Sequence, residues 1–169
     1  MGEKKFCRTT AIVTVSDRGS RGERDDISGR KLLERLNAEG FEVLYQEIVP
    51  DEISEISRVL RSYADDKKVA LIITTGGTGV SPRDVTPDAS LAVVERTIPG
   101  MAEAMRAASL QKTPHAMISR AVVGIRGKTL IANLPGSPKG ALENLEVLLP
   151  ALPHALEKIQ GDTSECATR

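Results

Sequence analysis

The sequence predicts an α/β domain built around a largely parallel sheet. Strand-like apolar runs alternate with helical patterns, one run is rich enough in β-branched residues for a strand buried on both faces, and polar Gly-containing stretches follow the strands. The 169 residues, of which 40% are hydrophobic and 27% charged, are typical of one globular domain. A chain of this length buries roughly 70% of its unfolded surface on folding, so its stability requires neither a disulfide nor a metal.

The first half of the chain is predicted to hold three strands separated by two helices. The strands cover residues 11–15, 41–49 and 69–75, and the third is expected to be central in the sheet. Asp26 is expected to cap the first helix, and Gly40 to end it in a left-handed conformation. The second helix carries apolar residues at helical spacing, namely Ile53, Ile56, Val59 and Leu60.

The second half of the chain is predicted to add helices and an antiparallel element. Thr86 is expected to cap a short helix with Pro87 at its first position, and a further helix follows Pro99-Gly100. Residues 121–125 and 129–134 are predicted to pair as a short hairpin. An otherwise parallel sheet would therefore gain an antiparallel edge.

The last helical region is expected to begin with Ser137 as its cap and Pro138 at its first position. Pro150 would cost about 3 kcal/mol inside a helix, so we expect two stacked helical pieces that break near Leu149. Residues 1–169 are expected to form one domain without a linker. Its ends, residues 1–7 and 162–169, are expected to fray.

Composition and segment analysis argue against several classes of protein. Lys plus Arg equals Asp plus Glu, 23 each, so the chain has no net positive charge to attract nucleic acid. Aromatic residues are 2% of the chain and Trp is absent, so few side chains could stack on bases. Cys7 and Cys166 form no CxxC pair, which argues against a zinc site or a disulfide framework. The longest apolar run has about five residues where roughly 20 are needed to cross a bilayer, and no signal peptide is recognisable. We therefore expect a cytoplasmic protein that binds neither nucleic acid nor membrane.

A glycine cluster directly after the predicted central strand is the strongest candidate for a ligand site. Gly76, Gly77 and Gly79 stand where open parallel sheets bind ligands, and glycines let backbone amides approach a phosphate closely. The loop has no Gly-Lys-Ser/Thr ending, and Pro82 stands where a dinucleotide fingerprint needs its third glycine. Phosphate charge would then be met by backbone amides, by Arg83 and by a metal ion. The alternative is a Gly-rich turn without a ligand.

Two aspartates are candidate metal ligands beside this loop. Asp84 follows the last glycine, and a carboxylate beside phosphate needs a cation such as Mg²⁺ to offset the repulsion. The alternative is that Asp84 pairs with Arg83 or caps the local turn. Asp51 stands at the carboxyl end of a strand, as a catalytic acid would, and also at a helix start, as an N-cap would.

Further candidate residues lie at other predicted strand ends, so several loops could converge on one cleft. Ser16 and Asp17 follow the first strand, and the segment from Asn133 to Ser137 follows the last. Asp17 could instead only close a turn, and Ser137 could act only as a helix cap. His115 and His154 have no Cys or acid at metal spacing and are expected at the surface or in packing.

The sequence resembles the Mog/MoaB family of molybdenum-cofactor biosynthesis proteins, which is related to the G domain of gephyrin. The resemblance covers about residues 8 to 161 and rests on six motifs in order, each weak alone: Val15-Ser-Asp-Arg18, Val49-Pro-Asp-Glu52, Thr74-Thr-Gly-Gly-Thr-Gly79, Pro82-Arg-Asp-Val-Thr-Pro-Asp-Ala89, Ser119-Arg120 and Asn133-Leu-Pro-Gly-Ser-Pro138. The resemblance implies a three-layer α/β/α molybdopterin-binding fold, commonly trimeric. It also implies molybdopterin and ATP as substrates, and possible contact with a molybdenum-insertion protein.

The Mog-type reaction implied by the resemblance transfers AMP from Mg-ATP to the terminal phosphate of molybdopterin and releases pyrophosphate. Asp51 and Asp84 match the family's two functional aspartates, expected to organise Mg²⁺ and the reacting phosphates. The expected substrate-binding residues are Ser16, Asp17, Thr75, Gly76, Gly77, Thr78, Gly79, Arg83, Pro135, Gly136 and Ser137. Such chemistry depends on positioning and charge neutralisation and needs no protein nucleophile.

Two hypotheses of different classes follow from this resemblance. The first is a nucleotidyltransferase, favoured by Arg83-Asp84-Val85 because some MoaB-type members carry Gly-Asp-Gln there. The second is a MoaB-type molybdopterin-binding or scaffold protein without adenylylation activity. Product formation from molybdopterin and Mg-ATP distinguishes the two.

Overall fold

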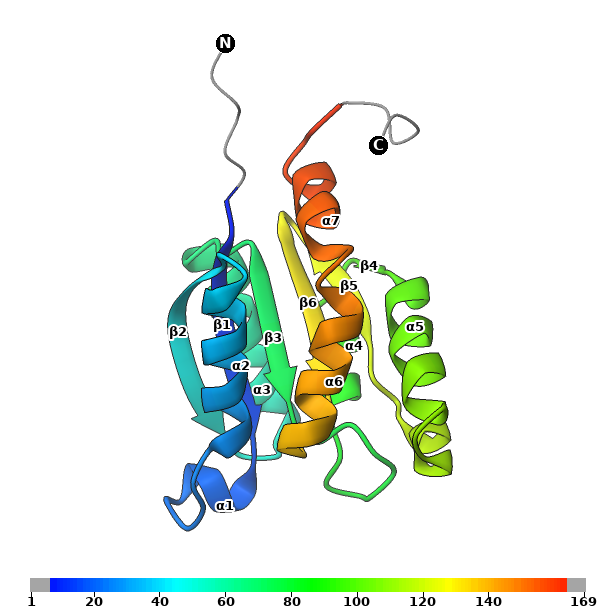
Figure 1. Ribbon diagram of the computed structural model, residues 1–169. Coiled ribbons are helices and arrows are strands. Elements are labelled where there is room, and N and C mark those ends of the chain that lie inside the picture. The colour runs from blue at the N-terminus through cyan, green and yellow to red at the C-terminus, as the bar shows by residue number, and fades with distance from the viewer. Residues whose placement is uncertain (1–6, 164–169) are drawn as a thin grey trace.

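The computed structural model describes residues 7–163, and a sheet of six strands runs through this part of the chain (Figure 1). The strand order is β2-β1-β3-β6-β5-β4. The four parallel strands are β2 (Glu42–Val49), β1 (Thr9–Val15), β3 (Leu71–Thr75) and β6 (Thr129–Leu134). Two antiparallel pairings complete the sheet, because β5 (Val123–Arg126) pairs with β6 and the short β4 (Arg96–Thr97) pairs with β5.

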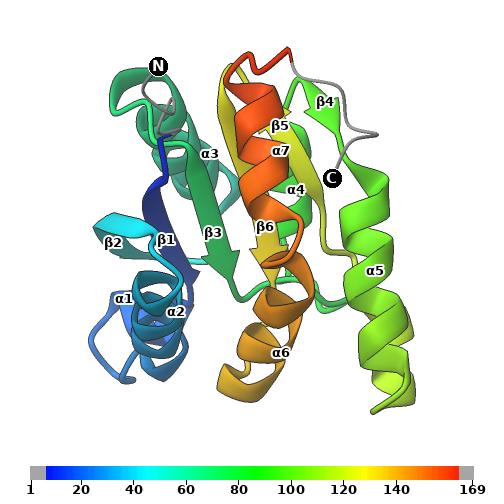
Figure 2. The ribbon, with the colours of Figure 1, turned by 45° about the horizontal axis from the view of Figure 1, so that its top comes forward.

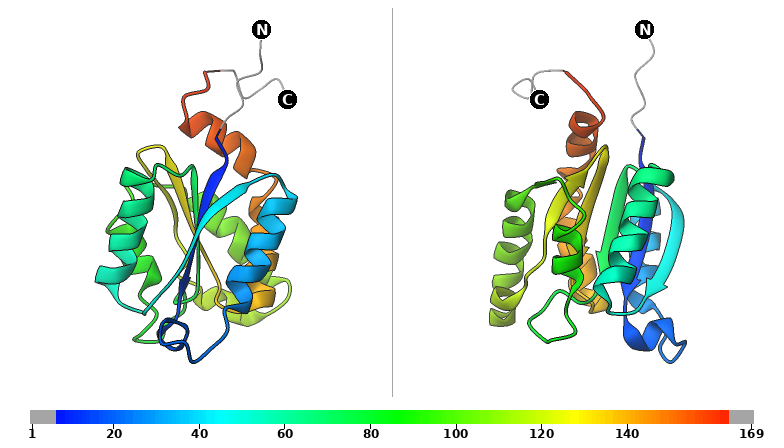
Figure 3. Two further views of the ribbon diagram at one scale, coloured as in Figure 1. Left: turned by 90° about the vertical axis from the view of Figure 1, so that its left-hand side faces the viewer. Right: turned by 180° about the vertical axis from the view of Figure 1, so that it is seen from behind.

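Helices cover both faces of the sheet and make three layers (Figures 2 and 3). One core lies under α2 (Ile27–Ala38), α5 (Pro99–Leu110), α6 (Pro138–Leu148) and α7 (Leu152–Ile159). The other lies under α3 (Ile53–Arg61), the π-helical turn η1 (Ser62–Asp66) and α4 (Thr86–Leu91).

Strand residues alternate between the two cores, as the two-residue period of a strand requires. In β1, Ile12 packs into the first core and Val13 into the second. In the central strand β3, Ile72 and Ile73 divide in the same way and are fully buried. Continuous apolar sequence in these strands is therefore explained by helices on both sides.

Most predicted elements are confirmed within one or two residues at their ends. Asp26 caps α2 by accepting from the amide of Gly29 at 2.8 Å, and Gly40 follows the helix with φ +79°. The hairpin is β5 and β6, which are antiparallel. Ser137 caps α6 by accepting from Gly140, and the final helical region breaks between Leu148 and Leu152.

Two capping predictions are wrong. Thr86 lies inside α4, whose N-cap position is Val85, and its hydroxyl donates to the carbonyl oxygen of Gly76 at 2.8 Å instead of capping the helix. The N-cap position of α3 is Glu52, so Asp51 stands one residue outside the cap. Both side chains are diverted by long-range partners at the site, which a local capping rule does not include.

Four short elements were not expected from the sequence. They are β4, the four-residue helix α1 (Asp17–Ser20), the π-helical turn η1, and the 3₁₀ turn η2 (Pro114–Ile118), which follows α5. Ser16 caps α1 by accepting from the amide of Gly19 at 3.0 Å. Because β4 and α1 are so short, hydrophobic periodicity gives little signal for them.

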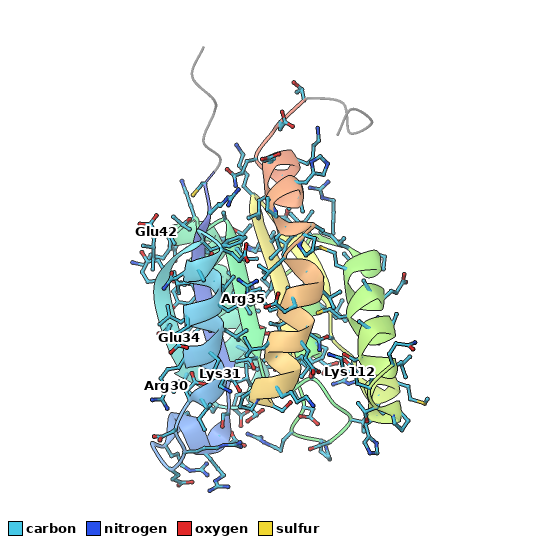
Figure 4. All side chains as sticks on the ribbon, viewed as in Figure 1. Arg30, Lys31, Glu34, Arg35, Glu42 and Lys112 are labelled. Atoms are coloured by element: carbon cyan, nitrogen blue, oxygen red, sulfur yellow. The ribbon has the colours of Figure 1, made fainter. Side chains whose placement is uncertain are left out.

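Ion pairs connect neighbouring helices on the first face. Arg35 of α2 points toward α6, where its Nη2 lies 3.0 Å from Oε2 of Glu146 (Figure 4). Lys112, which follows α5, places its Nζ 3.0 Å from Oε1 of Glu143 in α6. Within residues 7–163, no helix has the length and apolar character needed to span a membrane. The fraying predicted for the ends falls mostly on residues outside this range. Cys7 does lie inside it, and its amide donates to the side chain of Gln160 at 2.8 Å.

Candidate active site at the carboxyl edge of the sheet

The four parallel strands point their carboxyl ends to one edge of the sheet, at the bottom of Figure 1. Each is followed by a loop that carries predicted site residues: 16–26 after β1, 50–52 after β2, 76–85 after β3 and 135–137 after β6. This is the edge at which open α/β sheets bind their ligands.

Glycine is required where these loops pack backbone against backbone. Gly76 has φ +103°, and a Cβ there would lie 2.3 Å from the carbonyl oxygen of Val15. A Cβ on Gly136 would lie 3.2 Å from the Cα of Gly76. The Thr75 hydroxyl closes the same junction by donating to the carbonyl oxygen of Pro135 at 2.7 Å. Three strand-end loops are thereby held in contact, and the predicted glycine loop is built into the fold.

The second glycine of the loop brings it against a carboxylate. Gly77 has φ +63°, and a Cβ there would lie 2.5 Å from the Thr86 hydroxyl and 3.2 Å from Oδ1 of Asp51. The absence of a side chain therefore allows the peptide backbone to reach the strand-end aspartate. Thr86 supports this turn through its bond to Gly76 and through its amide, which donates to the carbonyl oxygen of Gly77 at 3.1 Å.

Asp17 and Asp51 hold each other's loops through reciprocal hydrogen bonds. The amide of Asp17 donates to Oδ2 of Asp51 at 2.8 Å, and the amide of Asp51 donates to Oδ1 of Asp17 at 3.0 Å. Arg83 closes over this pair from the glycine-rich loop, because Nη2 and Nε donate to the two carboxylate oxygens of Asp17 at 2.8 and 3.1 Å. Its Nη1 donates to Glu52 at 3.0 Å.

The two aspartates differ in how their charge is compensated. Hydrogen bonding from Arg83, together with the amide of Asp51, lowers the pKa of Asp17 below its usual value. Burial raises the pKa of Asp51, and the negative charges of Asp17 and Asp84 raise it further, against the opposing effect of the hydrogen bond from Asp17 and the charge of Arg83. The negative charge of an ionised Asp51 is therefore compensated poorly by its protein neighbours.

Asp84 caps the turn of its own loop. Its Oδ2 accepts from the amide of Ser81 at 2.8 Å, and a Cβ on Gly79 would lie 2.9 Å from the same oxygen. Arg83 pairs with Asp17 and Glu52, so the expected alternative of an Arg83–Asp84 pair is wrong and the turn-capping alternative is confirmed. Asp84 is nevertheless close enough for its charge to affect the pKa of Asp51.

Two cavities open at this edge, and the loop after β6 separates them. The larger, of about 350 Å³, is lined by seven of the predicted site residues: Ser16, Asp51, Thr75, Gly76, Gly77, Gly136 and Ser137. The smaller, of about 250 Å³, is lined by four: Thr78, Gly79, Pro135 and Ser137. Ser137 lines both cavities. Asp17, Arg83 and Asp84 line neither of them.

The start of α2 contributes residues that the sequence analysis did not assign to the site. Asp26 accepts from the Thr14 hydroxyl at 2.7 Å, and the Ser28 hydroxyl donates to the carbonyl oxygen of Gly136 at 2.8 Å. All four of these residues line the larger cavity. The N-cap pattern at Asp26 was the available signal, but it gave no indication that the helix start faces the β6 loop.

The smaller cavity also contains residues outside the predicted set. It is lined in part by Ser109 and Lys112 at the end of α5, by His115 and Ser119 around η2, and by Asn144 of α6. His115 is exposed, as expected, and is one of the residues that line this cavity. Within residues 7–163, no group of three or more His, Cys, Asp or Glu side chains forms a ready metal cage.

Comparison with known proteins agrees with this geometry. A family model described as "Probable molybdopterin binding domain" matches residues 11–154. Helicobacter pylori molybdopterin adenylyltransferase is 42% identical over 153 residues, which are 89% of this chain and 87% of that protein. Gephyrin of Dictyostelium discoideum is 42% identical over 170 residues, covering 95% of this chain and 24% of gephyrin.

Solved structures share the fold as well as the sequence. The molybdopterin biosynthesis enzyme MoaB of Thermus thermophilus has a TM-score of 0.87 and 52% identity, covering 93% of this chain and 98% of that one. The expected three-layer α/β/α fold and the resemblance to the Mog/MoaB proteins are therefore confirmed. The chain belongs to the family of probable molybdopterin-binding domains.

Proposed function

We propose that this chain is a molybdopterin adenylyltransferase that transfers AMP from Mg-ATP to the terminal phosphate of molybdopterin. An oxygen of that phosphate forms a bond to the α-phosphorus of ATP, the bond between the α-phosphorus and the bridging oxygen breaks, and pyrophosphate leaves. The main observation is the pair of cavities on the two sides of the 135–137 loop. We assign one substrate to each cavity, and Ser137, which lines both, would lie between the two substrates.

The glycine loop supplies the groups that such a transfer requires. Residues 76 and 77 line the larger cavity and residues 78 and 79 the smaller, so one run of backbone passes from one substrate position to the other. Its amides and Arg83 are the proposed phosphate contacts, with Asp17 and Ser16 holding the loop after β1 in place. Preorganised donors of this kind stabilise charge that develops in the transition state.

Mg²⁺ fits the residues at the site. Asp51 and Asp84 offer the hard oxygen ligands that Mg²⁺ prefers, and two carboxylates with substrate phosphates and water are a usual set. The poorly compensated charge of Asp51 supports the fit, since a cation beside it would relieve the repulsion from Asp17 and Asp84. When bound, the ion would neutralise phosphate charge. Asp51 and Asp84 would hold it.

The names of the relatives support the same activity. The Helicobacter pylori relative is a molybdopterin adenylyltransferase and matches this chain along most of both lengths. A second candidate, binding of molybdopterin without adenylylation, is favoured by the 52% identity to a MoaB structure. The two candidates share the molybdopterin site and differ in product.

Incubation of the wild type with molybdopterin and Mg-ATP separates the candidates. Transfer predicts adenylylated molybdopterin and an equal amount of pyrophosphate. Tight molybdopterin binding without an ATP-dependent product would contradict the transferase and support the binding protein. Lack of both binding and product would contradict both.

The assembly and setting of the protein are part of the proposal. We expect a homotrimer in the cytoplasm that passes adenylylated molybdopterin to a metal-insertion protein. The edge strand β2 supports self-association, because Leu44 and Ile48 are partly exposed on it. Light scattering coupled to size-exclusion chromatography should give three times the chain mass. A monomeric mass would contradict the trimer.

A further inference from the structure

One arginine outside the predicted site residues spans the glycine-rich loop. Arg120 lies between η2 and β5, and its Nε donates to the carbonyl oxygen of Gly79 at 2.9 Å. Its Nη2 donates to the carbonyl oxygen of Asp84. A single guanidinium therefore binds the first and last residues of segment 79–84.

This arginine is itself fixed by two other contacts. Its Nη1 and Nη2 lie 3.1 and 2.8 Å from the two carboxylate oxygens of Asp88 in α4, and its backbone amide donates to the carbonyl oxygen of Thr78 at 2.9 Å. The hydrogen bonds from Arg120 lower the pKa of Asp88 and keep that carboxylate charged. The planar five-donor guanidinium makes these contacts together, which a lysine ammonium cannot reproduce.

The Asp84 carboxylate is hydrogen-bonded within this closed segment. Oδ2 of Asp84 accepts from the amide of Ser81 in the middle of the same segment. If the two ends of the segment separate, the Ser81 amide moves relative to Asp84 and the carboxylate loses its fixed direction. Positioning groups of this kind matter because errors of about 1 Å in a site can cost roughly 100-fold in rate.

We propose that Arg120 is a positioning residue whose guanidinium closes segment 79–84 and thereby aims the Asp84 carboxylate for adenylyl transfer. The inference rests on the proposed function and extends it to a residue that acts through the backbone of the loop. Asp88 supports the same arrangement by anchoring the guanidinium to α4.

Arg126 offers a matched control at the opposite end of the sheet. It also binds an aspartate with two nitrogens, since Nη2 and Nε lie 2.7 and 2.9 Å from the carboxylate oxygens of Asp65. It also donates to a backbone carbonyl, that of Val93, at 3.0 Å. Replacing Arg126 with lysine therefore removes similar bonds far from the strand-end loops.

The test compares Arg120→Lys with Arg126→Lys in adenylyl transfer as the Mg²⁺ concentration is varied. For Arg120→Lys we expect kcat to fall about 10- to 100-fold. The Mg²⁺ concentration for half-maximal rate should rise about tenfold, as when the support of a metal ligand is removed. Arg126→Lys should match the wild type in both. Equal kcat and Mg²⁺ requirement in the two variants would overturn the proposal.

Hydrogen exchange of the Ser81 amide gives a readout that does not depend on product. Exchange should speed up at least about tenfold in Arg120→Lys and remain unchanged in Arg126→Lys, because only the first opens the segment. Unchanged exchange in Arg120→Lys would overturn the proposal even if the wild type made no product. A wild type without product, combined with faster exchange in Arg120→Lys, would contradict the proposed function alone.

Asp88→Asn keeps the test decisive if Arg120→Lys fails to fold. It weakens the anchor and leaves the bonds from Arg120 to the two loop carbonyls in place. We expect a change in the same direction, about threefold to tenfold in the Mg²⁺ requirement. A folded Asp88→Asn variant with the wild-type Mg²⁺ requirement and Ser81 exchange rate would contradict the proposal.

Discussion

The loops after β1 and β2 are joined by a reciprocal pair of hydrogen bonds, yet the pKa values of their two aspartates are shifted in opposite directions. Asp17 is paired with Arg83, and its pKa is lowered. Asp51 also accepts a hydrogen bond from the backbone, but burial and two neighbouring carboxylates raise its pKa. The difference indicates that Asp17 joins the two loops to Arg83. Under the proposed function, Asp51 would instead supply a charge to a bound cation. Unfavourable charge of this kind is common at functional sites.

Loss of either proposed metal ligand should have the largest effect. Asp51→Asn and Asp84→Asn should each lower the rate of adenylyl transfer by about 100-fold or more, because the amide keeps the shape and removes the charge. Pyrophosphate release at saturating Mg-ATP measures this. Asp65→Asn serves as the control, since Asp65 pairs with Arg126 away from the site and should retain the wild-type rate. A rate for Asp51→Asn within about threefold of that control would show that the residue is not part of the reaction.

Removal of the positive charge of Arg83, which pairs with Asp17, should have an intermediate effect on the reaction rate. Arg83→Gln should reduce kcat/KM for ATP by at least roughly tenfold, because a charge-assisted contact to phosphate contributes about 1.5–3 kcal/mol. Steady-state kinetics at fixed molybdopterin concentration checks this. An unchanged kcat/KM would limit Arg83 to a structural contact with the loop after β1.

Stability should respond to pH in opposite directions at the two aspartates. Because folding raises the pKa of Asp51, the contribution of this group to the free energy of unfolding is fully present below its unfolded pKa of about 3.8. The contribution is lost as the pH rises through the folded pKa. The lowered pKa of Asp17 gives a contribution that is present above about 3.8 and is lost as pH falls through the folded pKa.

At pH 7, ligand-free Asp51→Asn should therefore unfold at a temperature roughly 1–3 °C above the wild type. Asp17→Asn should unfold at a lower temperature than the wild type. Its free energy of unfolding should fall by less than about 1 kcal/mol, because the side chain of Arg83 is more than half exposed. The Asp51→Asn difference should disappear as the pH falls from the folded pKa of Asp51 to about 3.8, whereas the Asp17→Asn difference should shrink as the pH falls below about 3.8. Thermal unfolding across this range is the measurement, and a destabilised Asp51→Asn at pH 7 would contradict the assignment of its charge.

The smallest effect is expected at Glu52, the second partner of Arg83. Its side chain is 53% exposed, and it makes a single contact of 3.0 Å with the guanidinium. Glu52→Gln should change kcat/KM by less than about threefold, because exposed ion pairs contribute little. A loss as large as that of Arg83→Gln would mean that Glu52, and not Asp17, fixes the position of the guanidinium.

Local sequence signals were sufficient for most of the fold. The β-branched run at residues 69–75 predicted the central strand, and Asp26 and Ser137 predicted helix starts, because each signal involves residues a few positions apart. The same local rule gave a wrong capping prediction for Thr86. Its sequence context is that of a cap, but the glycine loop turns back and offers the hydroxyl a buried carbonyl oxygen.

The sequence predicted part of the lining of the two cavities, but not the contacts that connect the residues at the site. The glycine loop and the two aspartates stand at strand ends, which a parallel sheet brings together whatever the loop details. The pairing of Arg83 with Asp17 joins residues 66 positions apart, and Arg120 reaches Gly79 across 41 positions. No spacing rule relates such residues, so the contrast between Asp17 and Asp51 becomes visible only in the structure.

The most direct test of the account measures adenylylated molybdopterin and unfolding temperature on the same preparations of Asp51→Asn, Asp17→Asn and the wild type. The account predicts that Asp51→Asn is at least as stable as the wild type and makes almost no product. Asp17→Asn should be less stable and should retain turnover within about tenfold of the wild type. Product formation by Asp51→Asn at the wild-type rate would contradict the account.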